Sequence, residues 1–237
     1  MRRPLTAALA GAALLAGAVP AEAARVRVMV VGAEKTHHGA SSVAMKRVAV
    51  RVGGRRCRVA ARTPLAVLVR TRAKVSLRDY GRCSRRVRDA SGLYVRSIAG
   101  ERARGSAGWV YKVGRRLGTG AAGDPSGPFG NGGLRSRQRV LWFWCRSAGA
   151  CQRTLEAVPE STSVDAGRTL RVRVRGYDDR GRGVPVAGAT VRLGRVSAQT
   201  DAHGVAVLTA PARPGRVRLN ADHPAMVRAF PSRIAVR

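Results

Sequence analysis

The stretch TLRVRVRGYDDRGRGVPVAGATVRL, residues 169–193, alternates apolar side chains with arginine on both sides of a turn. Strict alternation of this kind is typical of strands with one buried and one solvated face. The turn contains Asp178 and Asp179 within YDDRGRG, which is typical of a hairpin. Similar short alternating runs recur from 159 to 237, separated by Gly, Asp and Pro, and no helix signal interrupts them. Residues 159–237 are therefore expected to form a small β-sandwich.

Residues 24–158 show the same strand character around a single helix signal. In TPLAVLVR, Thr63 can cap a helix that begins with Pro64. Strands are expected in six segments, the second of which is a pair of strands around Gly53 and Gly54: 24–32, 45–60, 74–83, 92–100, 108–114 and 140–145. The predicted fold class is mainly β, a small α+β domain with one helix on a mostly antiparallel sheet, followed by the sandwich.

The first 23 residues have the organisation of a secretory signal peptide. Arg2 and Arg3 precede an apolar run over 5–19, and Ala21-Glu22-Ala23 matches an A-x-A cleavage site. An uncleaved anchor is the alternative, although the run is short for a membrane span. We expect a mature chain from 24 that is secreted or held at the cell surface, without a transmembrane segment.

Four cysteines follow the signal segment, and an even number in an exported chain indicates disulfide bonds. Three pairings are possible. The local pairing joins Cys145 to Cys151, and Cys57 is then left with Cys83. A zinc site is the weaker alternative, because no C-x-x-C occurs and His37 and His38 lie far from every cysteine in the sequence. We therefore expect no metal.

The formal net charge of +32 comes from 41 arginines and four lysines against 13 acidic residues. Such a charge attracts polyanions, and the partners expected for an exported chain are anionic cell-envelope polymers rather than a specific nucleic acid. The alternative is that arginine reflects codon bias and lies on the solvated faces of strands.

The sequence GTGAAG at 118–123 matches the G-x-G-x-x-G dinucleotide motif. That motif needs a helix after its last glycine and an acidic residue about 20 positions later. Here Asp124-Pro125 follows Gly123, and no Asp or Glu occurs between Asp124 and Glu156. We expect a flexible surface loop and no cofactor.

Aromatic residues gather on both sides of this glycine-rich loop. Alternation places Trp109 and Tyr111 on one face of their strand. One interpretation is a buried core. The other is a recognition face for a small planar ligand beside the 114–133 loop. The candidate ligand-binding residues are Trp109, Tyr111, Arg115, Arg116 and Phe129.

No motif of nucleophilic or metal-assisted catalysis occurs in the chain. There is no G-x-S-x-G and no H-E-x-x-H, and the acidic residues are scattered. We expect His37 and His38 to lie in a loop, and we name no catalytic residue. The chain is accordingly not expected to be an enzyme.

Four pieces in order resemble the bacterial domain family that is similar to the C-terminal domain of transcobalamin. They are TPLAVLVR, the V-x-S-I-x-G match at 95–100, GWVYKV at 108–113, and the aromatic strand ending at 142–144. The resemblance covers about 25–155 and implies a helix against a mostly β sheet. In the vertebrate carriers the related domain covers one face of a corrinoid. Here Gly114-Arg115-Arg116 replaces the usual Asn-Gly, and the carriers' helical domain has no counterpart.

The second region resembles bacterial Ig-like and carboxypeptidase-regulatory-like modules, through PVAGATVRL at 185–193 and TDAHGVAVL at 200–208. Such modules act mostly as spacers or adhesion units. The function expected is a secreted or cell-surface binding or adhesion protein without catalysis. The alternatives are a carrier of a small planar, corrinoid-like ligand and an exported hydrolase.

Overall fold

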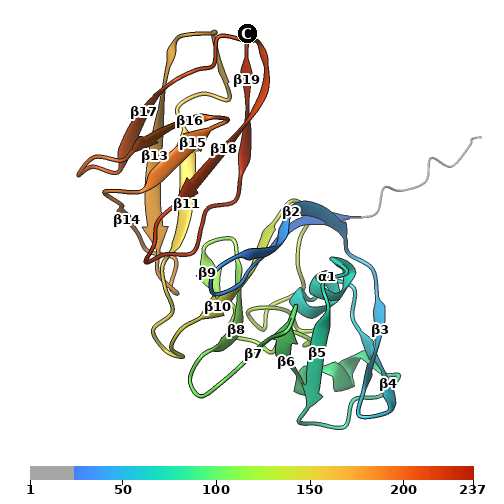
Figure 1. Ribbon diagram of the computed structural model, residues 1–237. Helices are drawn as coiled ribbons and strands as arrows, with labels where there is room; N and C mark the ends of the chain where they lie inside the picture. Colours follow the sequence, from blue (N-terminus) through green and yellow to red (C-terminus); the bar gives the residue numbers. More distant parts are fainter. Residues whose placement is uncertain (1–23) are drawn as a thin grey trace, which may run out of the picture.

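The computed structural model describes residues 24–237, and the expected signal peptide over 1–23 lies outside the described residues. The described chain is mainly β, with its strands in two lobes (Figure 1). The first lobe carries the α-helix and the second is built from strands alone, so the predicted fold class is confirmed.

The first domain is organised on a five-stranded sheet in the order β2-β1-β10-β8-β9. Only β1 and β10 run parallel, and the other pairs are antiparallel. The strands are β1 (Arg25–Val31), β2 (Thr36–Ala44), β8 (Gly108–Val113), β9 (Arg116–Leu117) and β10 (Arg139–Cys145).

Helix α1 (Pro64–Arg70) forms where the sequence predicts it. The Thr63 hydroxyl accepts a hydrogen bond from the Ala66 N–H at 3.2 Å and donates one to the Ala60 carbonyl at 2.8 Å. Leu65 and Leu68 are fully buried against the core face of the sheet. The Trp142 indole N–H donates to the Pro64 carbonyl at 3.3 Å, which ties β10 to the helix start.

A smaller β layer completes the first domain. It contains a hairpin, a three-stranded antiparallel sheet and a 3-10 turn. These elements are β3 (Val48–Val52), β4 (Arg55–Val59), β5 (Val75–Asp79), η1 (Val87–Gly92), β6 (Leu93–Ile98) and β7 (Glu101–Arg102). Gly53 and Gly54 turn the hairpin with positive φ, as the Gly-Gly pair predicts.

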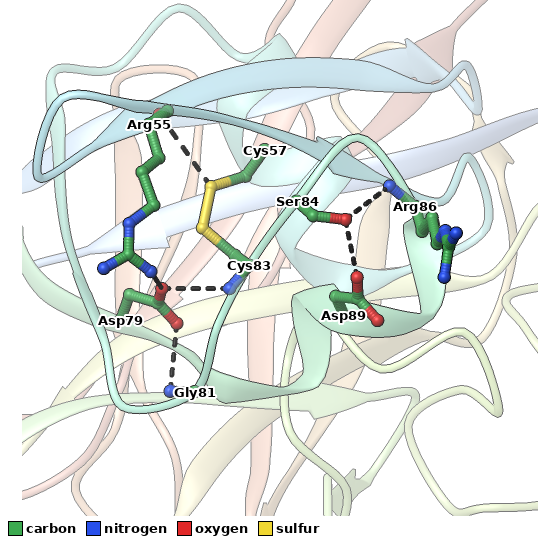
Figure 2. The surroundings of a disulfide bond; sticks show 8 residues. All are labelled: Arg55, Cys57, Asp79, Gly81, Cys83, Ser84, Arg86 and Asp89. Atoms are coloured by element: carbon green, nitrogen blue, oxygen red, sulfur yellow. Dashed lines mark hydrogen bonds and ion pairs between the residues drawn. A yellow bond between two sulfur atoms is a disulfide. The ribbon is translucent and has the colours of Figure 1, made fainter.

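The expected Cys57–Cys83 disulfide joins β4 to the segment that follows β5 (Figure 2). Asp79 organises that segment, because its carboxylate accepts from the N–H groups of Gly81 and Cys83, each at 3.0 Å. Farther along, Ser84 Oγ donates to Asp89 at 2.5 Å. The second disulfide, Cys145–Cys151, is also present, so both predicted pairings are confirmed.

The second domain is a sandwich of two sheets. In one sheet β13 pairs with β11, β14 and β17, and the other has the order β12-β19-β18-β15-β16. The strands are β11 (Thr154–Pro159), β12 (Ser163–Val164), β13 (Thr169–Tyr177), β14 (Gly183–Pro185), β15 (Thr190–Leu193), β16 (Val196–Gln199), β17 (Val205–Thr209), β18 (Gly215–Asp222) and β19 (Ser232–Val236). In β13, Leu170, Val172 and Val174 enter the core while the intervening arginines are exposed, as alternation requires.

Two features depart from the sequence-based expectations. His37 and His38 lie in β2 rather than in a loop, because this polar segment pairs with β1. The pairing contains two register irregularities. Strand β11 crosses the boundary expected at 158/159, since Thr154 to Pro159 all pair with β13.

The two domains share an apolar contact. One face of the first sheet covers the core beneath α1, and the other contributes Met29, Leu141 and Phe143 to a second cluster. Val227 of the second domain is buried in that cluster, and Phe230 packs on it. Burial of both faces explains why MVV in β1 is continuously apolar rather than alternating.

Candidate functional site

The candidate site is an apolar groove of about 370 Å³ between β6 and β8. The loop after β9 closes it, and aromatic side chains form much of its wall. The residues that line it are Tyr80, Ser91, Gly92, Leu93, Tyr94, Val95, Trp109, Val110, Tyr111, Leu117, Gly118, Gly120, Ala121, Ala122 and Trp142. This volume lies within the range of small-molecule sites, about 300–1,000 Å³.

The floor of the groove contains the two predicted β8 aromatics. Trp109 is 4% exposed, and its indole N–H donates to the Glu101 carbonyl at 2.8 Å. Tyr111 is 6% exposed, and its hydroxyl donates to the Gly120 carbonyl at 2.5 Å. Burial and, to a smaller extent, the Asp124 charge raise the pKa of Tyr111 to about 12. Both rings therefore belong to the core, with their polar atoms already paired, although both line the groove.

The backbone of β8 adds polar groups to this floor. The Gly114 N–H donates to Arg139 of β10, so by alternation the Trp109 and Tyr111 peptide groups point away from β10. The Tyr111 carbonyl accepts from Gly118 at 3.0 Å. Within residues 24–237, the N–H and carbonyl of Trp109 and the N–H of Tyr111 have no hydrogen-bond partner in the chain.

The rim carries two exposed tyrosines that the sequence reasoning did not select. Tyr80 is 66% exposed and Tyr94 is 40% exposed, and their rings meet edge-on at 6.0 Å. The Arg78 guanidinium lies 4.7 Å from the centre of the Tyr80 ring. Tyr94 could have been found, because Leu93 and Val95 point inward and alternation leaves the tyrosine on the outer face.

The glycine-rich loop, for which we expected a flexible surface loop, makes close contacts with β8 and η1. A Cβ on Gly118 would overlap the Tyr111 ring, and one on Gly123 would meet the Ala90 carbonyl oxygen. Within the loop, Thr119 and Gly120 donate to the Pro128 carbonyl, both at 3.0 Å. The glycines are thus needed for close approach. No helix follows Gly123, as its neighbours predict.

The remaining predicted site residues lie elsewhere. Arg115 pairs with Glu156 at 2.6 Å and covers the Tyr177 ring at 4.4 Å. Arg116 stands 4.9 Å from the centre of the Phe129 ring. Both arginines line a separate interdomain cleft of about 590 Å³. The structure therefore brings Trp109 and Tyr111 together but places Arg115, Arg116 and Phe129 outside the groove.

Other candidate polar clusters have local structural roles. His37 pairs with Glu101 at 3.1 Å beneath Trp109. Asp178 accepts from the N–H groups of Arg180 and Arg182, and these hydrogen bonds hold the pKa of its carboxyl below the usual range. Across residues 24–237, no three His, Cys, Asp or Glu side chains are placed to hold a metal ion. The same residues contain no helix of the length and apolarity that a membrane crossing requires.

A scan against models of protein families finds no match to this chain, and a search of curated proteins finds none either. The likenesses to the transcobalamin-related family and to Ig-like modules therefore rest on the sequence motifs themselves.

Proposed function

We propose that this chain is an exported, non-catalytic binding protein of the cell exterior that holds a flat, mostly apolar ring in the groove between β6 and β8. The observation that carries the proposal is the groove itself, apolar inside and bordered by exposed Tyr80 and Tyr94. Exposed aromatic rings at a rim offer stacking area for a flat ligand. The two disulfides agree with an oxidising compartment.

The shape of the groove limits the ligand. A volume of about 370 Å³ accepts one ring system of modest size or one portion of a larger one. A corrinoid would be covered on one side only, and the second domain does not reach the residues that line the groove. The free peptide groups of Trp109 and Tyr111 favour a ring that carries an edge donor and acceptor.

The test is equilibrium dialysis of the full chain against cyanocobalamin, flavin mononucleotide and a water-soluble porphyrin, with tryptophan fluorescence as a second readout. Trp109 and Trp142 line the groove, so a bound ring should quench emission. Tyr94→Ala should weaken binding about 3- to 10-fold by removing a stacking surface.

The matched control is Val207→Ala, which truncates an exposed apolar side chain on the second domain. If a ring binds equally well to the wild type and to both variants, it binds outside the groove. Retention of none of the three rings would argue against a planar-ligand carrier.

A further inference from the structure

A second cleft, of about 710 Å³, lies between the domains on the β2 side of the first sheet. Its residues come from β1 and β2 in the first domain and from β18, β19 and the loop before β19 in the second. They are Arg27, Gly39, Ala40, Ser42, Arg218, Pro231, Ser232 and Arg233. Three arginines and no carboxylate line it.

The arginines of this cleft are held together against their mutual repulsion. Arg218 and Arg233 are direct cross-strand partners in the β18–β19 ladder, where like charges destabilise a sheet. Arg27 faces them from the first domain, and burial, followed by the charges of Arg139 and Arg233, lowers its pKa.

Four nearby arginines share two acidic partners, whereas these three arginines have none among the described residues. Glu156 pairs with Arg115 and Arg139, and Asp222 pairs with Arg192 and Arg228. Among the described residues, Arg27, Arg218 and Arg233 form no ion pair. A counter-charge from outside the chain would complete the cleft.

The cleft also offers oriented hydrogen-bond donors. Arg27 Nη2 donates to the Pro231 carbonyl at 3.0 Å, which fixes its guanidinium across the domain boundary. Arg218 uses Nε for Asn220 at 2.9 Å and keeps both Nη groups available. Ser232 Oγ is buried without a hydrogen-bond partner in the described chain. Guanidinium forks and hydroxyls are the donors that phosphate oxygens prefer.

We infer that this interdomain cleft binds the phosphate groups of a linear anionic polymer of the cell envelope. A single ion would fill little of it, and the cleft continues into a neighbouring cavity of about 440 Å³ that shares Gly39, Arg218 and Pro231. No aromatic side chain lines either cavity, although single-stranded nucleic acid is usually held by stacking. The polymer would touch both domains and fix their orientation.

The experiment measures binding of fluorescently labelled short-chain polyphosphate to the full chain by anisotropy. The variant Arg218→Gln/Arg233→Gln removes two charges from the cleft. The control Arg171→Gln/Arg173→Gln removes two exposed charges from β13, outside the residues of the cleft. We expect the cleft variant to bind at least 10-fold more weakly and the control less than 3-fold.

The measurement has clear opposing outcomes. Equal weakening by both variants would overturn the site in favour of unspecific attraction by net charge. Inorganic phosphate and unlabelled polyphosphate can be compared as competitors at equal phosphate concentration. Equal competition by the two would show that the cleft binds a small ion and would overturn the proposal of a polymer ligand. Tighter binding of single-stranded DNA, with the same dependence on Arg218 and Arg233, would overturn the envelope polymer in favour of nucleic acid.

A thermal readout separates lost binding from lost folding. Polyphosphate should raise the unfolding temperature of the wild type and the control but not of the cleft variant, because only a ligand of the folded state stabilises it. Without ligand, the control should unfold at a temperature similar to that of the wild type, and the cleft variant should unfold at the same or a higher temperature, because two facing like charges are removed. Equal stabilisation of the cleft variant would contradict the proposed site.

Discussion

The side-chain ammonium of Lys112 lies 2.8 Å from the carbonyl oxygen of Asp178, so a lysine of the first sheet caps the backbone of the second domain. The same ammonium donates to the Tyr177 carbonyl at 3.0 Å and stands 3.5 Å from the Asp179 carboxylate. Lys112 is fully buried, and burial lowers its pKa in spite of the opposing effect of Asp179. If one domain moved relative to the other, the buried ammonium of Lys112 would lose its hydrogen-bond partners. This contact therefore favours one relative position of the two domains.

Lys112→Met should therefore reduce the free energy of unfolding by about 2–4 kcal/mol, since it leaves two carbonyls without their donor and the Asp179 carboxylate without its counter-charge. Urea unfolding followed by far-ultraviolet circular dichroism measures this loss. Lys46→Met is the control, because Lys46 is exposed, and it should change stability by less than about 0.5 kcal/mol. Equal stability of the two variants would show that the Lys112 contact does not stabilise the domain pair.

The start of α1 gives a second prediction. Thr63 is 1% exposed, and its hydroxyl both accepts from Ala66 and donates to Ala60. Thr63→Ala removes both hydrogen bonds and should cost about 1–2 kcal/mol. Thr63→Ser keeps the hydroxyl and should recover most of that loss in the same urea titration. A serine variant as unstable as the alanine variant would assign the effect to packing of the methyl group.

The two disulfides should differ in their contribution to stability. The Cys57–Cys83 bond spans 26 positions and the Cys145–Cys151 bond spans six. By loop-closure entropy, Cys57→Ala/Cys83→Ala should cost about 3.6 kcal/mol and Cys145→Ala/Cys151→Ala about 2.4 kcal/mol. Urea unfolding of both double variants gives the order directly, and the reverse order would contradict the entropic account. Thiol titration of the denatured wild type should detect no free thiol, since all four cysteines are paired.

Local patterns predicted those parts of the fold whose determinants lie close together in the sequence. Thr63-Pro64 marked the helix start, and the alternation in 169–177 marked β13. Strand β2 escaped prediction because its side chains are polar, and its pairing with β1 includes two irregularities. The loop at 118–133 appeared flexible because close approach of its glycines to Tyr111 and Ala90 depends on distant residues.

The candidate sites were less predictable for the same physical reason. The groove depends on β6 and β8 of two different sheets lying side by side, and nothing local to Tyr80 indicates that arrangement. The basic cleft joins Arg27 to Pro231 across 204 positions of the chain. Net charge predicted attraction to anions, but only the structure shows that the three arginines of this cleft lie together without an acidic partner among the described residues.

The buried phenol of Tyr111 predicts a specific loss of stability at alkaline pH. Its pKa is raised to about 12 in the folded protein, above the value of about 10 in an unfolded chain. The folded state therefore holds the proton more tightly, so this stabilisation is complete below about pH 10 and is lost toward about pH 12, at about 1.4 kcal/mol per pH unit. Tyr111→Phe cannot ionise at this position. The difference in free energy of unfolding between the wild type and this variant should therefore shrink between about pH 10 and 11. Urea unfolding of both proteins across that range measures the difference, with Tyr80→Phe as a control at an exposed ring. A difference between wild type and Tyr111→Phe that stays constant with pH would mean that the phenol ionises equally well in the folded and unfolded chain.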